Sequence, residues 1–272
     1  MSSEFFHGEH IIVHQLNVFF AHMREMLMEH FDKPEWNDTL FVLGGHTRCP
    51  LSWYEARHPG KRVIVYQSEQ LFGMGGGVGN NFIDMPRTIE NLRTYPEIWD
   101  YDDLNVEFLS WTNIHVKHVL PMLHTQRLKR IESVTDPKID VLFYGLMNQR
   151  RWEIMVGIQR TCYGQLRLAW VYGDPDMDKH IANSKVVLNL HAFEPWNRQE
   201  QVRMFYPVIN GKTVVSEPSQ VNRMEGLIIE MDPDQLGPYL KDICSSDEWR
   251  NFGLQAQKEF EERSKHIVLP TP

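Results

Sequence analysis

The sequence predicts an α/β protein made of two Rossmann-like parallel-sheet domains. Short apolar runs alternate with segments of helical spacing, which is the pattern of βαβ units. The stretch 186–217 shows one complete unit: an apolar run, a polar loop, a helix around Arg203, a glycine and a second apolar run. A chain of 272 residues has room for two such sheets. We therefore predict an N-terminal domain over residues 1–134 and a C-terminal domain over residues 135–272, whose final helix can pack back on the first.

The composition is that of a globular protein, with 42% hydrophobic and 24% charged residues. No apolar run reaches the roughly 18 residues that span a bilayer, and the first residues lack a secretory pattern, so we expect a cytoplasmic location and no membrane partner. The three cysteines have no metal-ligand spacing, as expected in a reducing compartment. The net charge of −8 argues against nonspecific binding of nucleic acid, although the basic stretch 117–130 leaves a local patch open.

In the N-terminal half, the 3-and-4 spacing of apolar residues from Ile12 onward predicts an amphipathic helix that Pro34 ends. Residues 40–43 and 62–66 predict two buried strands, residues 88–99 a helix that ends near Pro96, and residues 116–120 a further strand. His10 and His14 have the spacing of a helical metal pair, but no HExxH-type acid lies between them. Solvated or core histidines are therefore favoured, and no metal is predicted.

Polar side chains follow the first strands of this half. His46 lies in the turn after residues 40–43, and Glu69 lies just after residues 62–66. Ligands of open α/β sheets bind at the carboxyl ends of strands, so Glu69 has a functional interpretation as well as that of an ordinary solvated strand end. The glycine-rich segment 72–81 lacks the ending of a phosphate-binding loop, which favours a loop over the active-site crevice. Residues 100–103 predict a turn, with Asn105 able to cap the next helix.

In the C-terminal half, residues 139–144 predict a buried parallel strand. Gly145 and a polar turn then lead into a helix from Trp152 to about residue 162, a geometry in which backbone amides meet an anion. Arg150 and Arg151 put positive charge at this helix start, where the dipole disfavours it unless something negative is bound. The alternative is two exposed arginines at a small cost. Further strands are predicted at 166–171 and 227–229, and helices at 177–184, 234–244 and 247–265.

Four stretches, in this order, resemble motifs of small nucleotide-sugar-dependent glycosyltransferases of the GT-B class, above all short ones from large DNA viruses, phages and bacteria. Residues 63–71 (VIVYQSEQL) are similar to a YIIYQxEQL pattern, and residues 98–105 (IWDYDDLN) to VWDYSxxN. Residues 140–151 (DVLFYGLMNQRR) are similar to DVLFYGxxNxRR. The last pattern, LNxHxY…RxxxLLxxxxxVxSE, is matched by residues 188–191, Arg203 and residues 215–217. Each motif alone is weak, and their order makes the resemblance specific.

The resemblance implies two Rossmann-like domains facing a cleft, with a UDP-sugar most expected on the C-terminal domain and the acceptor on the N-terminal one. It implies that the chain's glycine after the strand approaches the diphosphate, that arginines neutralise it, that Tyr172 borders the base, that Glu217 binds the ribose, and that Asn189 and His191 line the sugar. Such enzymes stabilise the leaving group with cations and helix N-termini, without a bound metal. The implied donor-binding residues are Gly145, Asn148, Arg150, Arg151, Tyr172, Asn189, His191, Arg203 and Glu217.

The chain departs from the family where Tyr206 stands in place of a glutamate of some relatives, with Glu194 and Glu200 as the only acids nearby. An inverting mechanism also needs a general base near the acceptor hydroxyl. Glu69 is the first candidate for this base, followed by His46 and Asp100. A retaining mechanism would need no base in that role.

The predicted function is transfer of a sugar from a nucleoside diphosphate to a hydroxyl of a glycan, a small molecule or a hydroxymethylated base in phage-type DNA. No cofactor is predicted beside this co-substrate, and the sequence predicts no particular oligomeric state. The alternative is a non-catalytic Rossmann-type module that binds a nucleotide or a partner protein. A dinucleotide oxidoreductase ranks third, because no glycine fingerprint follows the first strand.

Overall fold

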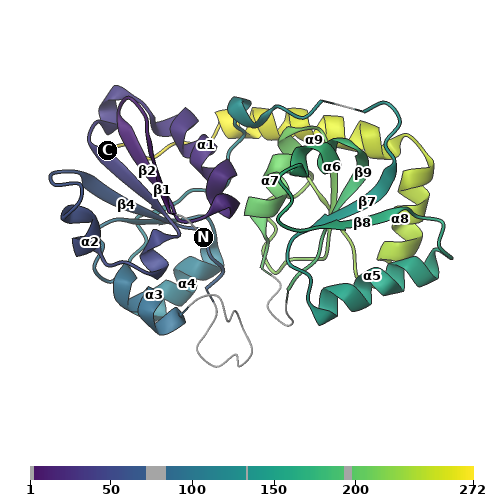
Figure 1. The fold of residues 1–272 in the computed structure, drawn as a ribbon, viewed down its shortest axis with the longest axis horizontal. Coiled ribbons are helices and arrows are strands. Elements are labelled where there is room, and N and C mark those ends of the chain that lie inside the picture. Colours follow the sequence, from purple (N-terminus) through teal and green to yellow (C-terminus); the bar gives the residue numbers. More distant parts are fainter. Residues whose placement is uncertain (1–2, 72–83, 133, 193–197) are drawn as a thin grey trace. The chain divides into compact units, whose positions relative to one another are not determined.

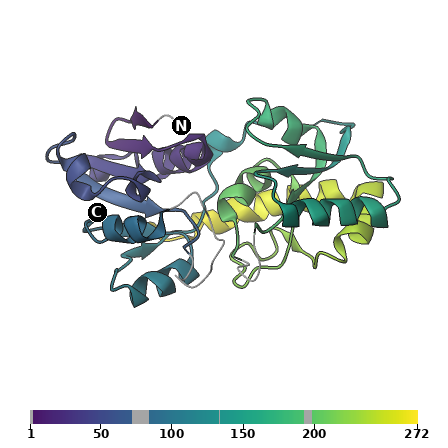
Figure 2. The same cartoon turned by 60° about the horizontal axis from the view of Figure 1, so that its bottom comes forward.

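The structure is a computed structural model that describes residues 3–71, 84–132, 134–192 and 198–272. The chain divides into an N-terminal unit, Met1–Arg127 with Val268–Pro272, and a C-terminal unit, Leu128–Ile267. Each unit has its own sheet with helices on both faces, as Figures 1 and 2 show. This confirms the predicted fold class, two Rossmann-like parallel-sheet domains.

The sheet of the N-terminal unit has the strand order β1-β2-β3-β4-β5-β6. β1 is antiparallel to β2, and every other neighbouring pair is parallel. Because parallel strands end at the same edge, the turns after β3, β4 and β5 lie together. The strands are β1 (Glu4–His7), β2 (Ile11–Gln15), β3 (Thr39–Leu43), β4 (Arg62–Gln67), β5 (Ile98–Asp100) and β6 (His118–Val119), and the helices are α1 (Ala21–Phe31), α2 (Leu51–Glu55), α3 (Met85–Leu92) and α4 (Asp103–Trp111).

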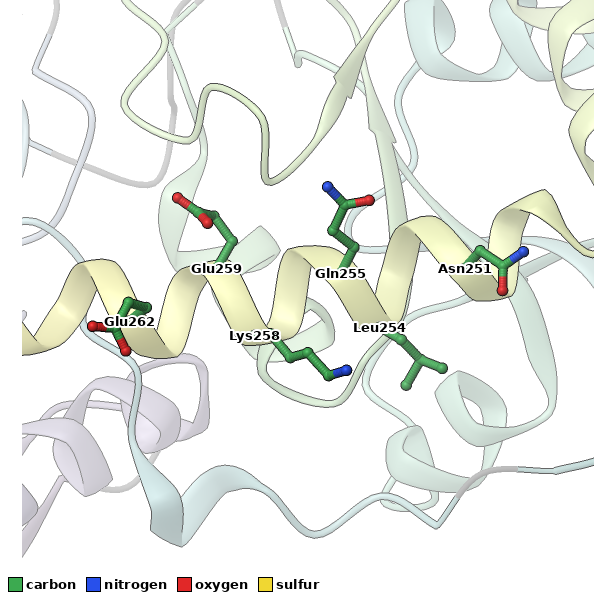
Figure 3. Close-up of a pocket in the computed structure, with 6 residues that line it drawn as sticks. All are labelled: Asn251, Leu254, Gln255, Lys258, Glu259 and Glu262. Carbon is green, nitrogen blue, oxygen red and sulfur yellow. The ribbon is translucent and has the colours of Figure 1, made fainter.

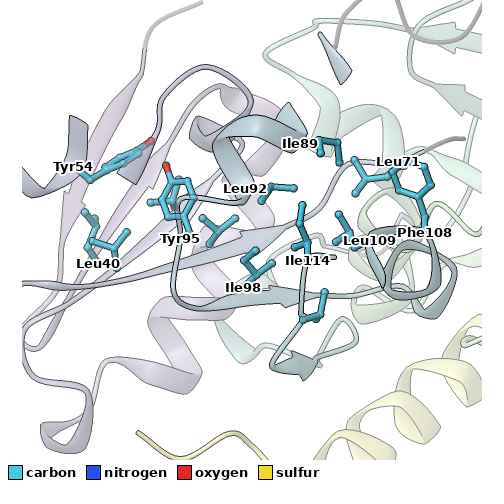
Figure 4. Packing of buried hydrophobic residues seen from close by; sticks show 14 of the residues in the cluster. Leu40, Tyr54, Leu71, Ile89, Leu92, Tyr95, Ile98, Phe108, Leu109 and Ile114 are labelled. Carbon is cyan, nitrogen blue, oxygen red and sulfur yellow. The ribbon is translucent and has the colours of Figure 1, made fainter. Parts of the chain in front are cut away.

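Alternate residues of these strands face two different layers, as expected for the period of a β-strand. Leu40 and Val42 of β3 belong to the cluster under α3 and α4, which Figure 4 shows. Phe41, between them, contacts Phe31 of α1 and Trp99 of β5 on the opposite face. The sheet is therefore covered on both faces, and its carboxyl edge is the part that polar side chains can use.

The predicted helix from Ile12 onward is wrong over its first part. Residues 11–15 form β2, which is buried along its whole length between β1 and β3. A strand covered on both faces has a continuous apolar run. The apolar residues of β2 and α1 together therefore fit the spacing of a single helix. The β-branched residues Ile11, Ile12 and Val13 were the signal for a strand.

A second correction concerns residues 88–99, which do not form one helix. α3 ends at Leu92, and Ile98–Asp100, beyond Pro96, is the strand β5 between β4 and β6. The proline prevents the helix from continuing, and the short apolar pair that follows pairs with β4. The cap of the next helix also differs: Asp102, not Asn105, accepts from the first amides of α4.

The C-terminal unit has the order β11-β10-β9-β7-β8, with all neighbouring pairs parallel. β7 has the predicted bounds, Ile139–Tyr144. α5 and α8 pack on the face that carries Val141 and Phe143, whereas α7 and α9 lie against β9 and β10. The strands are β7, β8 (Leu168–Val171), β9 (Ser184–Asn189), β10 (Thr213–Ser216) and β11 (Ile229–Glu230), and the helices are α5 (Gln149–Thr161), α6 (Met177–Ala182), α7 (Gln201–Ile209), α8 (Leu236–Ser245) and α9 (Glu248–Lys265).

Candidate functional site

The carboxyl edge of the C-terminal sheet collects most of the predicted donor-binding residues. β7, β9 and β10 are adjacent and parallel, so the residues that follow them emerge at one edge. α5 follows β7, and α7 follows β9, so both helices begin at that edge. In open α/β sheets this is where ligands bind. The predicted residues that the topology brings here are Gly145, Asn148, Arg150, Arg151, Asn189, His191, Arg203 and Glu217.

Gly145 and Arg203 are in direct contact at this edge. Gly145 has φ +139°, a conformation that side chains rarely adopt. A Cβ at Gly145 would lie 3.3 Å from Cζ of Arg203 and 3.4 Å from its Nε and Nη2. Glycine is therefore needed both for the backbone turn and for the guanidinium that occupies the space above it.

Arg203 has hydrogen-bond partners on one side of its guanidinium and none on the other within the described part of the chain. Its Nη1 donates to Glu200 Oε2 at 2.6 Å and to Asn189 Oδ1 at 3.2 Å. Among the described residues, its Nε and Nη2, the nitrogens nearest Gly145, have no hydrogen-bond partner. The side chain is about one-fifth exposed, at 22%. A planar cation that is already oriented and has two nitrogens available as donors suits a phosphate or carboxylate.

Arg150 is paired with Glu217 instead of being free for a ligand. Its Nη1 and Nη2 donate to the two carboxylate oxygens at 2.8 and 2.5 Å, and Nη1 also donates to the carbonyl of His191. The His191 amide donates to Glu217 as well. The predicted ribose acid and one predicted phosphate cation thus bind each other, and the Glu217 side chain is buried.

Arg151 is a buried brace of the same edge. It donates to the carbonyls of Leu190 and Leu146 and to Glu200 Oε1 at 3.1 Å. Burial lowers its pKa to about 10. The negative charge that the helix-dipole argument required at Arg150 and Arg151 is therefore supplied by the protein's own carboxylates. Glu200, which sequence reasoning did not place in the site, connects Arg151 to Arg203.

The remaining polar residues of this edge shape its backbone. Asn148 is the N-cap of α5, which begins at Gln149 and not at the predicted Trp152. The Asn148 side chain accepts from the amide of Arg151 and donates to the carbonyl of residue 192. Asn189 links β9 to β10 by donating to Ser216, and the His191 ring contacts the carbonyl of residue 218. Each of these contacts orders the loops around Arg203.

Tyr172 lies after β8, the edge strand beside β7. Its side chain is about half exposed. Trp170 of β8 is exposed to a similar degree, and its indole N–H donates to the carbonyl of Gly145 at 2.9 Å. The sequence analysis missed Trp170, although an aromatic residue on an edge strand next to the glycine turn was a usable signal.

In the N-terminal unit, Glu69 follows β4 at the carboxyl edge. Its backbone carbonyl accepts from the side-chain amides of Gln67 and Asn105, and its amide donates to Gln67. These bonds hold the backbone of Glu69 at the end of the strand. Burial raises the pKa of its carboxyl group to about 7. A carboxylate with this pKa can both take up and release a proton near neutral pH.

His46 lies in the turn after β3 and is fully buried. Burial lowers the pKa of its imidazole to about 4, an effect that nearby Gln67 opposes only in part. Among the described residues, neither ring nitrogen makes a hydrogen bond of ordinary geometry. His46 is therefore a neutral imidazole at physiological pH, close to the strand end that carries Glu69.

Asp100, the third candidate base, has a different environment. It is fully buried at the end of β5, and its oxygens accept from the amide of Asp102 and from the side chains of Asn105 and Gln67. Burial raises its pKa well above the usual value. These three donors tie Asp100 to the start of α4 and to the end of β4, which is the arrangement of a structural anchor.

Two predicted features lie outside the described residues. They are the glycine-rich segment 72–81 and the part of the polar loop that contains Glu194, Trp196 and Asn197. Among the residues that the structure describes, no group of three His, Cys, Asp or Glu side chains has the arrangement of a metal site. Within the same residues, none of the helices is long and apolar enough to cross a membrane.

A shallow hollow elsewhere on the C-terminal unit runs along α9. Figure 3 shows the six side chains that line it, all from this one helix. None of the predicted donor or base residues contributes to it. Its lining residues are Asn251, Leu254, Gln255, Lys258, Glu259 and Glu262.

No protein family model matches the chain. An uncharacterized protein of Acanthamoeba polyphaga mimivirus is 25% identical over 185 residues, which are 68% of this chain and 24% of that protein. The chain therefore spans about a quarter of that relative's length.

Solved structures of glycosyltransferases share the fold. Anabaena HepE in complex with UDP and glucose matches 84% of this chain and 74% of its own, with a TM-score of 0.57 and 11% identity. A mutant of S. aureus TarM, in complex with Fondaparinux, alpha-GlcNAc-glycerol and UDP, matches with a TM-score of 0.56 and 9% identity. That match covers 83% of this chain and about half of TarM, 52%. At these identities the comparison shows the fold, which is that of GT-B glycosyltransferases.

Proposed function

We propose that the chain is a nucleotide-sugar-dependent glycosyltransferase that uses a UDP-sugar as donor and needs no bound metal. The observation that carries the proposal is the contact between Arg203 and Gly145, in which two guanidinium nitrogens have no partner among the described residues at the carboxyl edge of a parallel sheet. The UDP complexes of HepE and TarM, which have the same fold, support the choice of donor. In this proposal the C-terminal unit holds the donor and the N-terminal unit the acceptor.

On the donor side, Arg203 binds the diphosphate and stabilises the negative charge that develops as the leaving group departs. Gly145 leaves the room that this approach requires. Arg150 and Arg151 act mainly by bracing Glu217 and Glu200, which keeps the edge rigid. Tyr172 borders the base, Asn189 and His191 lie toward the sugar, and Glu217 has lone pairs left for a ribose hydroxyl. The last four roles come from the family resemblance.

On the acceptor side, we assign the general base to Glu69. An acceptor hydroxyl oxygen forms a bond to the anomeric carbon, the bond from that carbon to the diphosphate oxygen breaks, and the hydroxyl proton passes to the Glu69 carboxylate. The pKa of about 7 fits this task, because the base form is abundant at neutral pH and still binds a proton effectively. The acceptor is a hydroxyl of a glycan, a small molecule or a hydroxymethylated base in DNA.

The first test is binding. Thermal unfolding measured with UDP, UDP-sugars, other nucleoside diphosphates and NAD should show a rise in melting temperature for the uridine compounds, because a ligand that binds only the native state stabilises it. Protection by NAD alone would point to an oxidoreductase and overturn the proposal.

The second test is turnover. Incubation with UDP-sugars and a panel of acceptor hydroxyls, with UDP release as the readout, should give transfer or at least slow hydrolysis. UDP binding without any transfer or hydrolysis, including on hydroxymethylated DNA, would favour the non-catalytic module. On a DNA acceptor, activity should fall steeply with salt, which separates it from a neutral glycan.

A further inference from the structure

The helix that carries Arg203 contains a defect four residues further on. In an α-helix, the carbonyl of each residue accepts from the amide of the fourth residue after it. The fourth residue after Arg203 is Pro207, which lies inside α7 and has no amide hydrogen. The carbonyl of Arg203 therefore lacks its helical donor. A carbonyl left unsatisfied in a protected position destabilises the conformation that holds it.

A side chain from the sheet supplies the missing donor. The hydroxyl of Tyr144 donates to the carbonyl of Arg203. Tyr144 is the last residue of β7 and directly precedes Gly145. The strand end that leaves space for the guanidinium of Arg203 thus also binds the backbone of the same residue. Burial raises the pKa of Tyr144, so the hydroxyl keeps its proton over the physiological range.

We propose that Tyr144 is a positioning residue for donor binding: its hydroxyl replaces the amide that Pro207 removes and thereby holds Arg203 over Gly145. The proposal rests on the proposed role of Arg203 toward the diphosphate. If so, the effects of substitutions at residues 144 and 207, which are 63 positions apart in the sequence, should depend on each other. Tyr144 is required because residue 207 is proline, and it should become dispensable once residue 207 has an amide.

The experiment compares the wild type with Tyr144→Phe, Pro207→Ala and the double variant. Binding of UDP, inorganic pyrophosphate and uridine is measured by calorimetry, and KM and kcat are measured with the UDP-sugar. Tyr144→Phe should weaken UDP and pyrophosphate about tenfold, the scale of one lost hydrogen bond and the unsatisfied group it leaves. Uridine affinity should not change, because uridine has no diphosphate. KM for the donor should rise more than kcat falls.

Pro207→Ala alone should change UDP affinity less than twofold, because the new amide and Tyr144 can both serve the carbonyl. The double variant should recover to within about twofold of Pro207→Ala. Tyr239→Phe, on α8, is the matched control for loss of a partly buried hydroxyl and should leave UDP affinity unchanged. Circular dichroism and melting temperature confirm that each variant is folded.

Two results would overturn the inference: unchanged UDP affinity in Tyr144→Phe, or a double variant as weak as Tyr144→Phe. Either result is distinct from failure of the proposed function, which Arg203→Ala tests directly. If Arg203→Ala binds UDP as the wild type does, the donor assignment fails. If Arg203→Ala loses UDP but Tyr144→Phe does not, only the positioning role fails.

Discussion

The carboxyl edges of the two sheets give their ionisable side chains opposite environments. At this edge of the C-terminal unit, buried charges meet opposite ones: Arg150 binds Glu217, and Glu200 lies between Arg151 and Arg203. In the N-terminal unit, the half-buried Glu69 and the fully buried His46 have no such partner among the described residues, and their pKa values move to about 7 and about 4. One edge preserves charge, and the other favours the neutral forms.

The difference is confined to the carboxyl edge and is not a property of the whole N-terminal unit. At the opposite end of the same sheet, Glu97 accepts hydrogen bonds from Arg62, Trp99 and Lys117. Burial raises the pKa of Glu97, but these hydrogen bonds lower it further, so the pKa lies below its ordinary value. The unit can pair a carboxylate and does so away from the proposed site. Groups poised between protonation states suit proton transfer, whereas preorganised cations suit an anion.

The largest expected effect is that of Glu69→Gln. The substitution keeps the shape of the side chain and removes the base, so kcat should fall about 10² to 10⁴-fold. UDP affinity should not change if the two edges have separate tasks. The measurement is steady-state transfer together with UDP calorimetry, and Glu90→Gln on the exposed surface of α3 is the control. Full activity in Glu69→Gln would remove the base assignment.

The pH dependence sharpens the same point. Transfer requires the deprotonated form of Glu69, whose pKa is about 7, so kcat/KM should rise tenfold per pH unit below 7 and level off above it. The profile is measured between pH 5 and 9 with one donor and one acceptor. A plateau that extends down to about pH 5 would indicate a base of ordinary carboxylate pKa or a mechanism without one.

Arg203→Ala should reduce kcat/KM for the donor about 10² to 10³-fold, the range found when one preorganised donor to a developing anion is removed. Unlike Glu69→Gln, it should also weaken UDP and pyrophosphate. Arg160→Ala, an exposed arginine of α5, is the matched control for the loss of one positive charge. Loss of turnover in Arg203→Ala with intact UDP binding would break the proposed division of tasks.

Acid should destabilise the N-terminal unit through its buried histidines. Burial lowers the pKa of His14 and of His46 to about 4, below the ordinary value of 6.5. The unfolded chain therefore binds protons first, and stability is lost as pH falls from about 6.5 toward 4, by up to about 3 kcal/mol per histidine. Urea unfolding at several pH values should show this slope, flatter in His14→Asn and unchanged in the exposed control His115→Asn. A slope that His14→Asn leaves intact would contradict the assignment.

The smallest effect is expected for Gly145→Ala. A Cβ there would lie 3.3 Å from the Arg203 guanidinium, in a backbone conformation that alanine adopts with strain. UDP affinity should fall about tenfold, and the melting temperature should drop slightly. Gly164→Ala is the matched control, because its φ is also positive but its Cβ would meet only the flexible side chain of Gln159. Equal UDP affinities in the two variants would show that the contact with Arg203 is unimportant.

Much of the C-terminal sheet was predictable, because its strands are covered on both faces and read as short apolar runs bounded by turn residues. β7 was predicted with its observed bounds, and the turn at Gly145 was correctly placed between strand and helix. The N-terminal region was harder. β2 lies directly before a helix with apolar residues in compatible spacing, so local periodicity alone joined them.

By itself, the sequence determined that charged and polar residues gather where strands end and helices begin, since strand and helix periods are local properties. It also indicated that two arginines at the start of α5 require negative charge nearby. Only the tertiary structure decided which carboxylates pair with these arginines, because Glu217 is 67 residues from Arg150, and Glu200 is 49 residues from Arg151. Likewise, no local rule connects Tyr144 with the carbonyl of Arg203. The partner of a buried charge or of an unsatisfied carbonyl is set by chain segments that meet only when the sheet assembles.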